Sequence, residues 1–222
     1  MSCLFVTCLL VCTGCIQTPS AGKNLGENAG QLSQSPPSIL TQVPDVRQSQ
    51  SYSCGAASLQ AVFNYWGIDE REGMLIQELN STEETGTPPE SLVRVARAHG
   101  LHAYMLSNLT LADLEQFNAN GTPVIIACQA WRTPEEENQS WDNLWDDGHY
   151  MVVIGLDKDN VYFEDPSLLG SRGFIPRQEF LSRWHDYEGT SLSGPNSTVF
   201  SHLGIIIRGN EPAVYPTFTY VD

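Results

Sequence analysis

QSQSYSCGAASL, at residues 48–59, places a cysteine where a loop of small polar residues turns into an amphipathic helix. The first turn of a helix carries free N–H groups and a partial positive charge, and both favour a thiolate there. We therefore expect Cys54 to be a stronger nucleophile than an ordinary cysteine. Gln48 stands six residues upstream, where its side-chain amide could donate a hydrogen bond. The alternative is that Cys54 is a structural cysteine of the helix.

Two later stretches carry the groups that such a nucleophile requires, HYMVVIG at residues 149–155 and FEDP at residues 163–166. A catalytic thiol needs an imidazole that takes and returns its proton, and a further group that orients the imidazole. His149 begins a strongly apolar strand, and Asp165 follows the next strand, so the hairpin could bring the two together. The order Gln, Cys, His, Asp is typical of papain-like catalysis. The alternatives are a histidine satisfied within its strand and an aspartate that only shapes a turn before proline.

Composition limits the classes of function. The chain has 222 residues, enough for one domain and a leader. Its 26 acidic and 11 basic residues give a net charge of −15, which argues against nucleic acid as a partner. We expect no cofactor and no metal, since no Walker-type glycine loop is present and no acidic segment matches the spacing of a Ca²⁺ loop. We expect a monomer.

The first residues have the character of an export signal. Residues 4–16 are apolar and uncharged, too short to span a bilayer but typical of the h-region of a signal peptide. CTGC at residues 12–15 resembles a bacterial lipobox, although Cys12 stands where Leu is usual and no Lys or Arg precedes the apolar run. We expect a signal peptide at residues 1–15 with a lipid anchor on Cys15, in a protein secreted across the inner membrane and held at the cell envelope. A plain secretory signal and a cysteine-rich apolar tail are the alternatives.

The rest of the chain predicts a tether and one α+β domain. Residues 16–38 are rich in Gly, Ser, Asn, Gln and Pro, which predicts a flexible linker, and the domain is expected at residues 39–222. Helices are expected at residues 54–66, 74–79, 87–100, 110–121 and 178–184. Strands are expected at residues 40–46, 124–129, 150–156, 161–164, 173–176 and 202–208. Helices followed by an antiparallel sheet indicate the α+β class. Cys128, within one of these strands, is expected to be buried and unpaired.

Several motifs resemble the bacteriocin-processing, double-glycine cysteine peptidase family, and more closely its stand-alone, papain-like members. They lie between residues 43 and 207 and comprise Gln48, YSCGAA at 52–57, NYWG at 64–67, PVI at 123–125, GHYMVVIG at 148–155 and DP at 165–166. The resemblance implies a papain-like fold in which an N-terminal helical part packs on a C-terminal antiparallel sheet. It also implies Cys54 as nucleophile, His149 as general base and acid, and Asp165 as orienting group.

By the same resemblance, Gln48 donates to the oxyanion together with the backbone N–H of Cys54. One departure is Ser53, since transporter-linked members often have Asp before the cysteine. ATP binding and cleavage of double-glycine leaders are not carried over, because we expect none of the membrane and nucleotide-binding domains of those exporters.

Peptide hydrolysis through a thioester on Cys54 is therefore the predicted activity, with a peptide or protein as substrate. The alternatives are amide or γ-glutamyl transfer, as in phytochelatin-synthase-like enzymes, and a peptide-binding module without catalysis. Residues 132–148 carry six acidic residues and lead into His149. With the tryptophans at 131, 141 and 145 they could form a lid that attracts basic peptides. They could equally be a solvated acidic loop pinned by aromatic packing.

Overall fold

A six-stranded antiparallel sheet organises the computed structural model, which describes residues 40–168, 170–216 and 220. The strands lie in the order β1 (His102–Leu106), β8 (Gly204–Arg208), β2 (Val124–Gln129), β3 (Gly148–Leu156), β4 (Asn160–Glu164) and β5 (Gly173–Pro176). A separate hairpin is formed by β6 (His185–Glu188) and β7 (Thr198–Ser201). The expected α+β class is confirmed.

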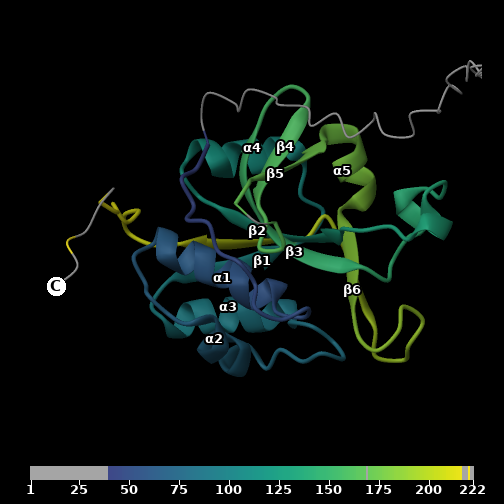
Figure 1. Cartoon of the computed structure of the whole chain (residues 1–222), viewed down its shortest axis with the longest axis horizontal. Coiled ribbons are helices and arrows are strands. Elements are labelled where there is room, and N and C mark those ends of the chain that lie inside the picture. The colour runs from purple at the N-terminus through teal and green to yellow at the C-terminus, as the bar shows by residue number, and fades with distance from the viewer. Residues whose placement is uncertain (1–39, 169, 217–219, 221–222) are drawn as a thin grey trace, which may run out of the picture. The chain divides into compact units, whose positions relative to one another are not determined.

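Helices cover both faces of the sheet (Figure 1). One face carries α1 (Cys54–Tyr65), α2 (Glu72–Leu79) and α3 (Pro89–Ala98). The other carries α4 (Leu111–Ala119) and α5 (Arg177–Arg183). Two short 3₁₀ turns, η1 (Pro134–Glu136) and η2 (Trp141–Asn143), lie in the segment between β2 and β3.

The central strands are apolar along most of their length because both faces are buried. In β2, Ile125 and Ala127 pack in the hydrophobic cluster that contains α1, α2 and α3. Val124, Ile126 and Cys128 pack in the other cluster, with residues of α4 and α5. Side chains of a strand point alternately to its two faces, so a strand covered on both faces reads as a continuous apolar run.

Close packing fixes α1 across the sheet. The Ser58 hydroxyl donates to the Tyr150 carbonyl of β3 at 3.1 Å, and this hydrogen bond is buried. A Cβ atom at Gly55 would lie 2.6 Å from the side chain of Thr87, so only glycine lets α1 approach the start of α3 this closely. The helix ends at Tyr65, and Gly67 follows with φ of +79°. These contacts determine where the first residue of α1, Cys54, lies.

The expected strand at residues 40–46 is wrong, and no strand is assigned there. Thr41 N–H donates to the Ile154 carbonyl at 2.7 Å, but no ladder follows. Pro44 has no N–H to offer, and Val46 N–H donates to the side chain of Glu164 at 2.9 Å instead of to a strand.

Other differences concern elements that the sequence did not indicate. Strand β1 and the β6–β7 hairpin were not expected, and the last strand begins at Gly204 because His202 adopts a left-handed φ of 49°. The expected signal peptide, lipid anchor and linker, residues 1–38, lie outside the described residues. Within the described part of the chain, no helix has the length and apolar character that crossing a membrane requires.

Candidate active site

Cys54 is the first residue of α1 and lines a cavity of about 350 Å³. It is 9% exposed and forms no disulfide with Cys128, the other cysteine that the structure describes. The loop before it is held by Glu72 of α2, whose carboxylate accepts from Ser49 N–H at 2.9 Å and from the Ser53 hydroxyl at 2.6 Å. Ser53, the departure from the family pattern, is fully buried and accepts from Gln50 N–H at 3.0 Å. The loop that delivers the thiol is therefore tightly fixed.

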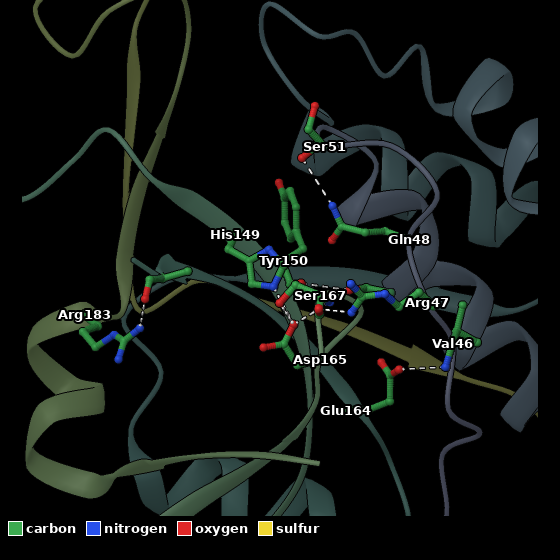
Figure 2. A network of polar contacts seen from close by, with 12 residues as sticks. Val46, Arg47, Gln48, Ser51, His149, Tyr150, Glu164, Asp165, Ser167 and Arg183 are labelled. Atoms are coloured by element: carbon green, nitrogen blue, oxygen red, sulfur yellow. Dashed lines mark hydrogen bonds and ion pairs between the residues drawn. The ribbon is translucent and has the colours of Figure 1, made fainter. Parts of the chain in front are cut away.

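His149 and Asp165 lie together, although sixteen positions separate them in sequence (Figure 2). The ring atom Nε2 of His149 lies 2.8 Å from Asp165 Oδ1. His149 is the second residue of β3, and Asp165 directly follows β4, so the β3–β4 pairing brings both to one end of the sheet. Ser167 fixes the carboxylate, since its N–H donates to Asp165 Oδ1 at 2.9 Å and its hydroxyl at 2.7 Å.

The electrostatics of this pair favour a charged ring. Burial opposes a charge on His149, but hydrogen bonds with Asp165 and Cys54, and the charges of both groups, outweigh it and raise the pKa of His149 to about 9. Burial likewise opposes the charge of Asp165, but the hydrogen bond and charge of His149 and the two bonds from Ser167 outweigh it and lower the pKa of Asp165. At neutral pH the two groups are an imidazolium and a carboxylate. Because Cys54 contributes a hydrogen bond and a charge to the raised pKa of His149, three of the four residues expected from the sequence lie together.

Gln48 does not point its donors at the cysteine. Its amide nitrogen donates to the carbonyls of Gln50 at 2.7 Å and Ser51 at 3.3 Å. Figure 2 shows this nitrogen turned toward Ser51. The amide oxygen is buried and has no hydrogen-bond partner. The oxyanion role of Gln48 therefore stays a prediction, which requires the amide to leave its two carbonyl partners.

The segment 132–148 combines features of both alternatives that the sequence left open. Trp141 lies between the guanidinium groups of Arg132 and Arg183, at 3.8 and 4.0 Å from its ring centre, which pins the segment. Trp131 and Trp145 instead line the cavity together with Cys54. The Trp131 ring also lies 4.7 Å from the ring of His149 and shields that buried side chain.

Part of the site was not foreseen. Asp186, Tyr187 and Glu188 of β6 and Phe200 of β7 line the same cavity. No motif in the sequence marks this hairpin. Ser167, which fixes Asp165, could have been found from the DPS sequence, because Asp and Ser near proline commonly hydrogen-bond their own turn.

Among the residues that the structure describes, one group of side chains could hold a metal ion. Glu70, Glu78 and His99 place one potential ligand atom each within 4.8 Å of the others. They lie around α2 and α3, and none of them lines the cavity beside Cys54.

Comparison with known proteins identifies the family. The sequence model of the Peptidase_C39 like family matches residues 40–192. The chain belongs to this family. An uncharacterized protein of Methanothermobacter thermautotrophicus is 31% identical over 123 residues, which is 55% of this chain and 71% of that protein. The transport/processing ATP-binding protein ComA of Streptococcus pneumoniae is 29% identical over 138 residues, 62% of this chain but 17% of ComA.

Solved structures share the fold of this C39-like chain. A C39-like peptidase structure from Bacillus anthracis superposes with a TM-score of 0.55 and 20% identity, covering 78% of this chain and 98% of that one. The peptidase domain of Streptococcus ComA superposes with a TM-score of 0.53 at 18% identity, and the match covers 78% of this chain and 98% of that domain. The double glycine motif protease of an AMS/PCAT transporter, solved with its leader peptide, superposes with a TM-score of 0.50 at 22% identity. This match covers 77% of this chain and 94% of that one. By family and fold the protein is a cysteine-type peptidase.

Proposed function

We propose that the protein hydrolyses peptide bonds with Cys54 as nucleophile, His149 as proton carrier and Asp165 as the group that orients His149. The observation that supports this most directly is the 2.8 Å contact between Nε2 of His149 and Asp165 Oδ1. It leaves the other ring nitrogen, Nδ1, for Cys54, whose hydrogen bond contributes to the raised pKa of His149. A ring with a pKa of about 9 carries its proton at neutral pH, and this charge favours a thiolate beside it.

The reaction then follows from these charges. The Cys54 thiolate attacks the peptide carbonyl, and the C–N bond of the tetrahedral intermediate breaks as His149 donates its proton to the leaving amine. This leaves a thioester on Cys54 and a neutral ring. His149 next takes a proton from water as the hydroxide attacks the thioester. The C–S bond of the second tetrahedral intermediate then breaks, which releases the carboxylic acid product and leaves the Cys54 thiolate beside protonated His149, as at the start. Asp165 holds the ring in place throughout.

The oxyanion needs donors that the resting geometry only partly supplies. The N–H of Cys54 belongs to the first turn of α1, where N–H groups have no acceptor within the helix. In the proposal Gln48 is the second donor, and substrate binding turns its amide away from the carbonyls of Gln50 and Ser51. A developing negative charge is a stronger acceptor than a carbonyl, which supplies the driving force for that exchange.

Thiol alkylation tests the nucleophile without knowledge of the substrate. We expect iodoacetamide at pH 7 to label Cys54 faster than Cys128 by about 10³-fold or more, since a buried thiol with a pKa of about 12 has almost no thiolate. Peptide mapping by mass spectrometry reads both sites in one sample, and labelling in denaturant gives the reference in which the two react alike. Equal labelling of the two cysteines in the folded protein would rule out an activated Cys54.

Location is a separate proposal that rests on the sequence alone. We propose that the protein is exported across the inner membrane and anchored by a lipid on Cys15, because CTGC at residues 12–15 ends an apolar, uncharged run. Mass spectrometry of the mature N-terminus tests this. A diacylglyceryl-modified Cys15 at the N-terminus supports it, and an unmodified or uncleaved N-terminus contradicts it.

A further inference from the structure

The cavity beside Cys54 has walls of one charge. It is formed by residues 83–87, by the end of the segment before β3, and by the β6–β7 hairpin. Its lining includes six acidic residues, Glu83, Glu84, Asp146, Asp147, Asp186 and Glu188. Among the described residues that line it, none is Lys, Arg or His. The negative charge of these walls is therefore not balanced by any cation of the lining.

Asp186 occupies the innermost of these acidic positions. Its carboxylate lies against the backbone of Gly148, so closely that a Cβ atom there would lie 2.5 Å from Asp186 Oδ2. Oδ1 accepts from Tyr187 N–H at 2.8 Å and from the Gln129 amide at 3.4 Å. Gly148 directly precedes His149, so this carboxylate stands at the border between the cavity and the reacting groups.

The carboxylates of the cavity lack compensation. Burial raises the pKa of Asp186 to about 7, despite two hydrogen bonds and the nearby charge of His149. Burial and the charges of neighbouring acids also raise the pKa values of Asp147 and Glu188. A cation that enters the cavity stabilises these carboxyl groups in their ionised form, which burial and mutual repulsion disfavour.

The remaining walls fit a long cationic side chain. Trp131 and Trp145 line the cavity, and Trp131 is 50% exposed. Indole rings attract cations to their faces and also cover the methylene stems of Lys and Arg. A small metal ion fits less well. Of all His, Cys, Asp and Glu in the described residues, one group alone converges within 4.8 Å, and it is Glu70, Glu78 and His99 rather than any set of cavity acids.

We propose that this cavity is the subsite for a Lys or Arg side chain of the peptide substrate, with Asp186 as the carboxylate that determines the specificity. The inference rests on the proposed function only in that the bound peptide is the substrate of Cys54. The acids of the two exposed walls, such as Glu84 and Asp146, attract the cation, and Asp186 receives it beside the reacting groups.

Peptide binding to the full chain carrying Cys54→Ala tests the subsite without turnover. The probes are an acetylated, amidated octapeptide of Ala and Gly with three arginines and its counterpart with three citrullines, which keep the shape of Arg but lose its charge. By calorimetry we expect the arginine peptide to bind about tenfold more tightly or better. Adding Asp186→Asn should reduce that ratio to about threefold or less, while Glu135→Gln, an exposed acid outside the cavity, should leave it within about twofold.

The control variants distinguish an effect of the carboxylate at Asp186 from an effect of the net charge of the protein. Glu135→Gln replaces a carboxyl group by its amide as Asp186→Asn does, so an equal loss in both variants would overturn the role of Asp186. Equal affinity for the two peptides would overturn the subsite. If circular dichroism shows that Asp186→Asn does not fold, the double variant Glu84→Gln with Asp146→Asn, at two exposed cavity residues, must reduce the ratio instead. Failure of the wild-type protein to hydrolyse any peptide would refute the proposed function and leave this binding result standing.

Discussion

Cys54 and Cys128 stand in opposite settings. Cys54 begins a helix and lines a cavity, whereas Cys128 lies within β2 with no exposed surface. Burial raises the pKa of Cys128 to about 12, so its thiol stays protonated and behaves as a small apolar group. Cys128 is nevertheless the residue directly opposite His149 in the β2–β3 ladder. Adjacency to an imidazole in the ladder therefore does not lower the pKa of Cys128, and Cys54 differs from it by lining a cavity and by standing at a helix N-terminus.

The largest expected effect is on peptide hydrolysis. We expect Cys54→Ala to lower kcat/KM by about 10³-fold or more, because the thioester can no longer form. Cys128→Ala should stay within about threefold of the wild type, since that thiol is buried in a hydrophobic cluster and has no role in the proposed reaction. Cleavage of a pool of internally quenched peptides measures both. Comparable losses in the two variants would contradict the assignment of separate roles.

The next largest effect is expected from Asp165, which bonds to the ring of His149. We expect Asp165→Asn to lower kcat/KM on the order of 10²-fold, because the ring loses its orienting charge. The sign of the pH effect follows from His149. Its pKa is raised to about 9 partly by Asp165, and the leaving amine needs the protonated ring, so activity falls as pH rises through that value. In Asp165→Asn this alkaline limb should move to lower pH by about one unit.

A pH–rate profile of the two proteins between pH 6 and 10 measures the shift. Alkylation of Cys128 at each pH provides an internal reference, because this thiol has no exposed surface and should stay unlabelled in the folded protein. An unchanged alkaline limb in Asp165→Asn would mean that Asp165 does not set the charge of the ring.

The same contrast explains what the sequence could and could not foretell. The positions of Cys54, His149 and Asp165 in the fold could be foreseen because each stands at the boundary of a helix or strand whose apolar pattern is local. Asp186 was not, because its place depends on how a hairpin after α5 packs on the end of β2, where Gln129 bonds to both His185 and Asp186. Such tertiary contacts leave no periodic signal in the chain.

The sequence could not predict the direction in which individual polar groups point. Gln48 stands six residues before Cys54, as expected of the predicted oxyanion donor, yet its amide donates to two carbonyls of its own loop. The strand expected at residues 40–46 failed for a related reason, since Val46 N–H finds an acceptor in the buried Glu164 side chain, 118 positions away. Residue type and spacing predict which groups meet, but competing local hydrogen bonds decide how they point.

The smallest expected effect is on stability, and here the order of the two cysteines is reversed. We expect the free energy of unfolding to depend more on Cys128, which we expect to be dispensable for activity, than on Cys54. Cys128→Ser places a hydroxyl in a hydrophobic cluster without a designed partner, which should lower the free energy of unfolding by about 1–3 kcal/mol. Because Cys54 lines a cavity open to water, Cys54→Ser should lower the free energy of unfolding by less than about 1 kcal/mol. Urea unfolding at pH 7 measures both changes. Cys128→Ala keeps the site apolar and separates the cost of the hydroxyl from the loss of packing. Equal stability of the two serine variants would mean that water or a backbone carbonyl reaches Cys128, and the distinction between a sealed and an accessible thiol would fail.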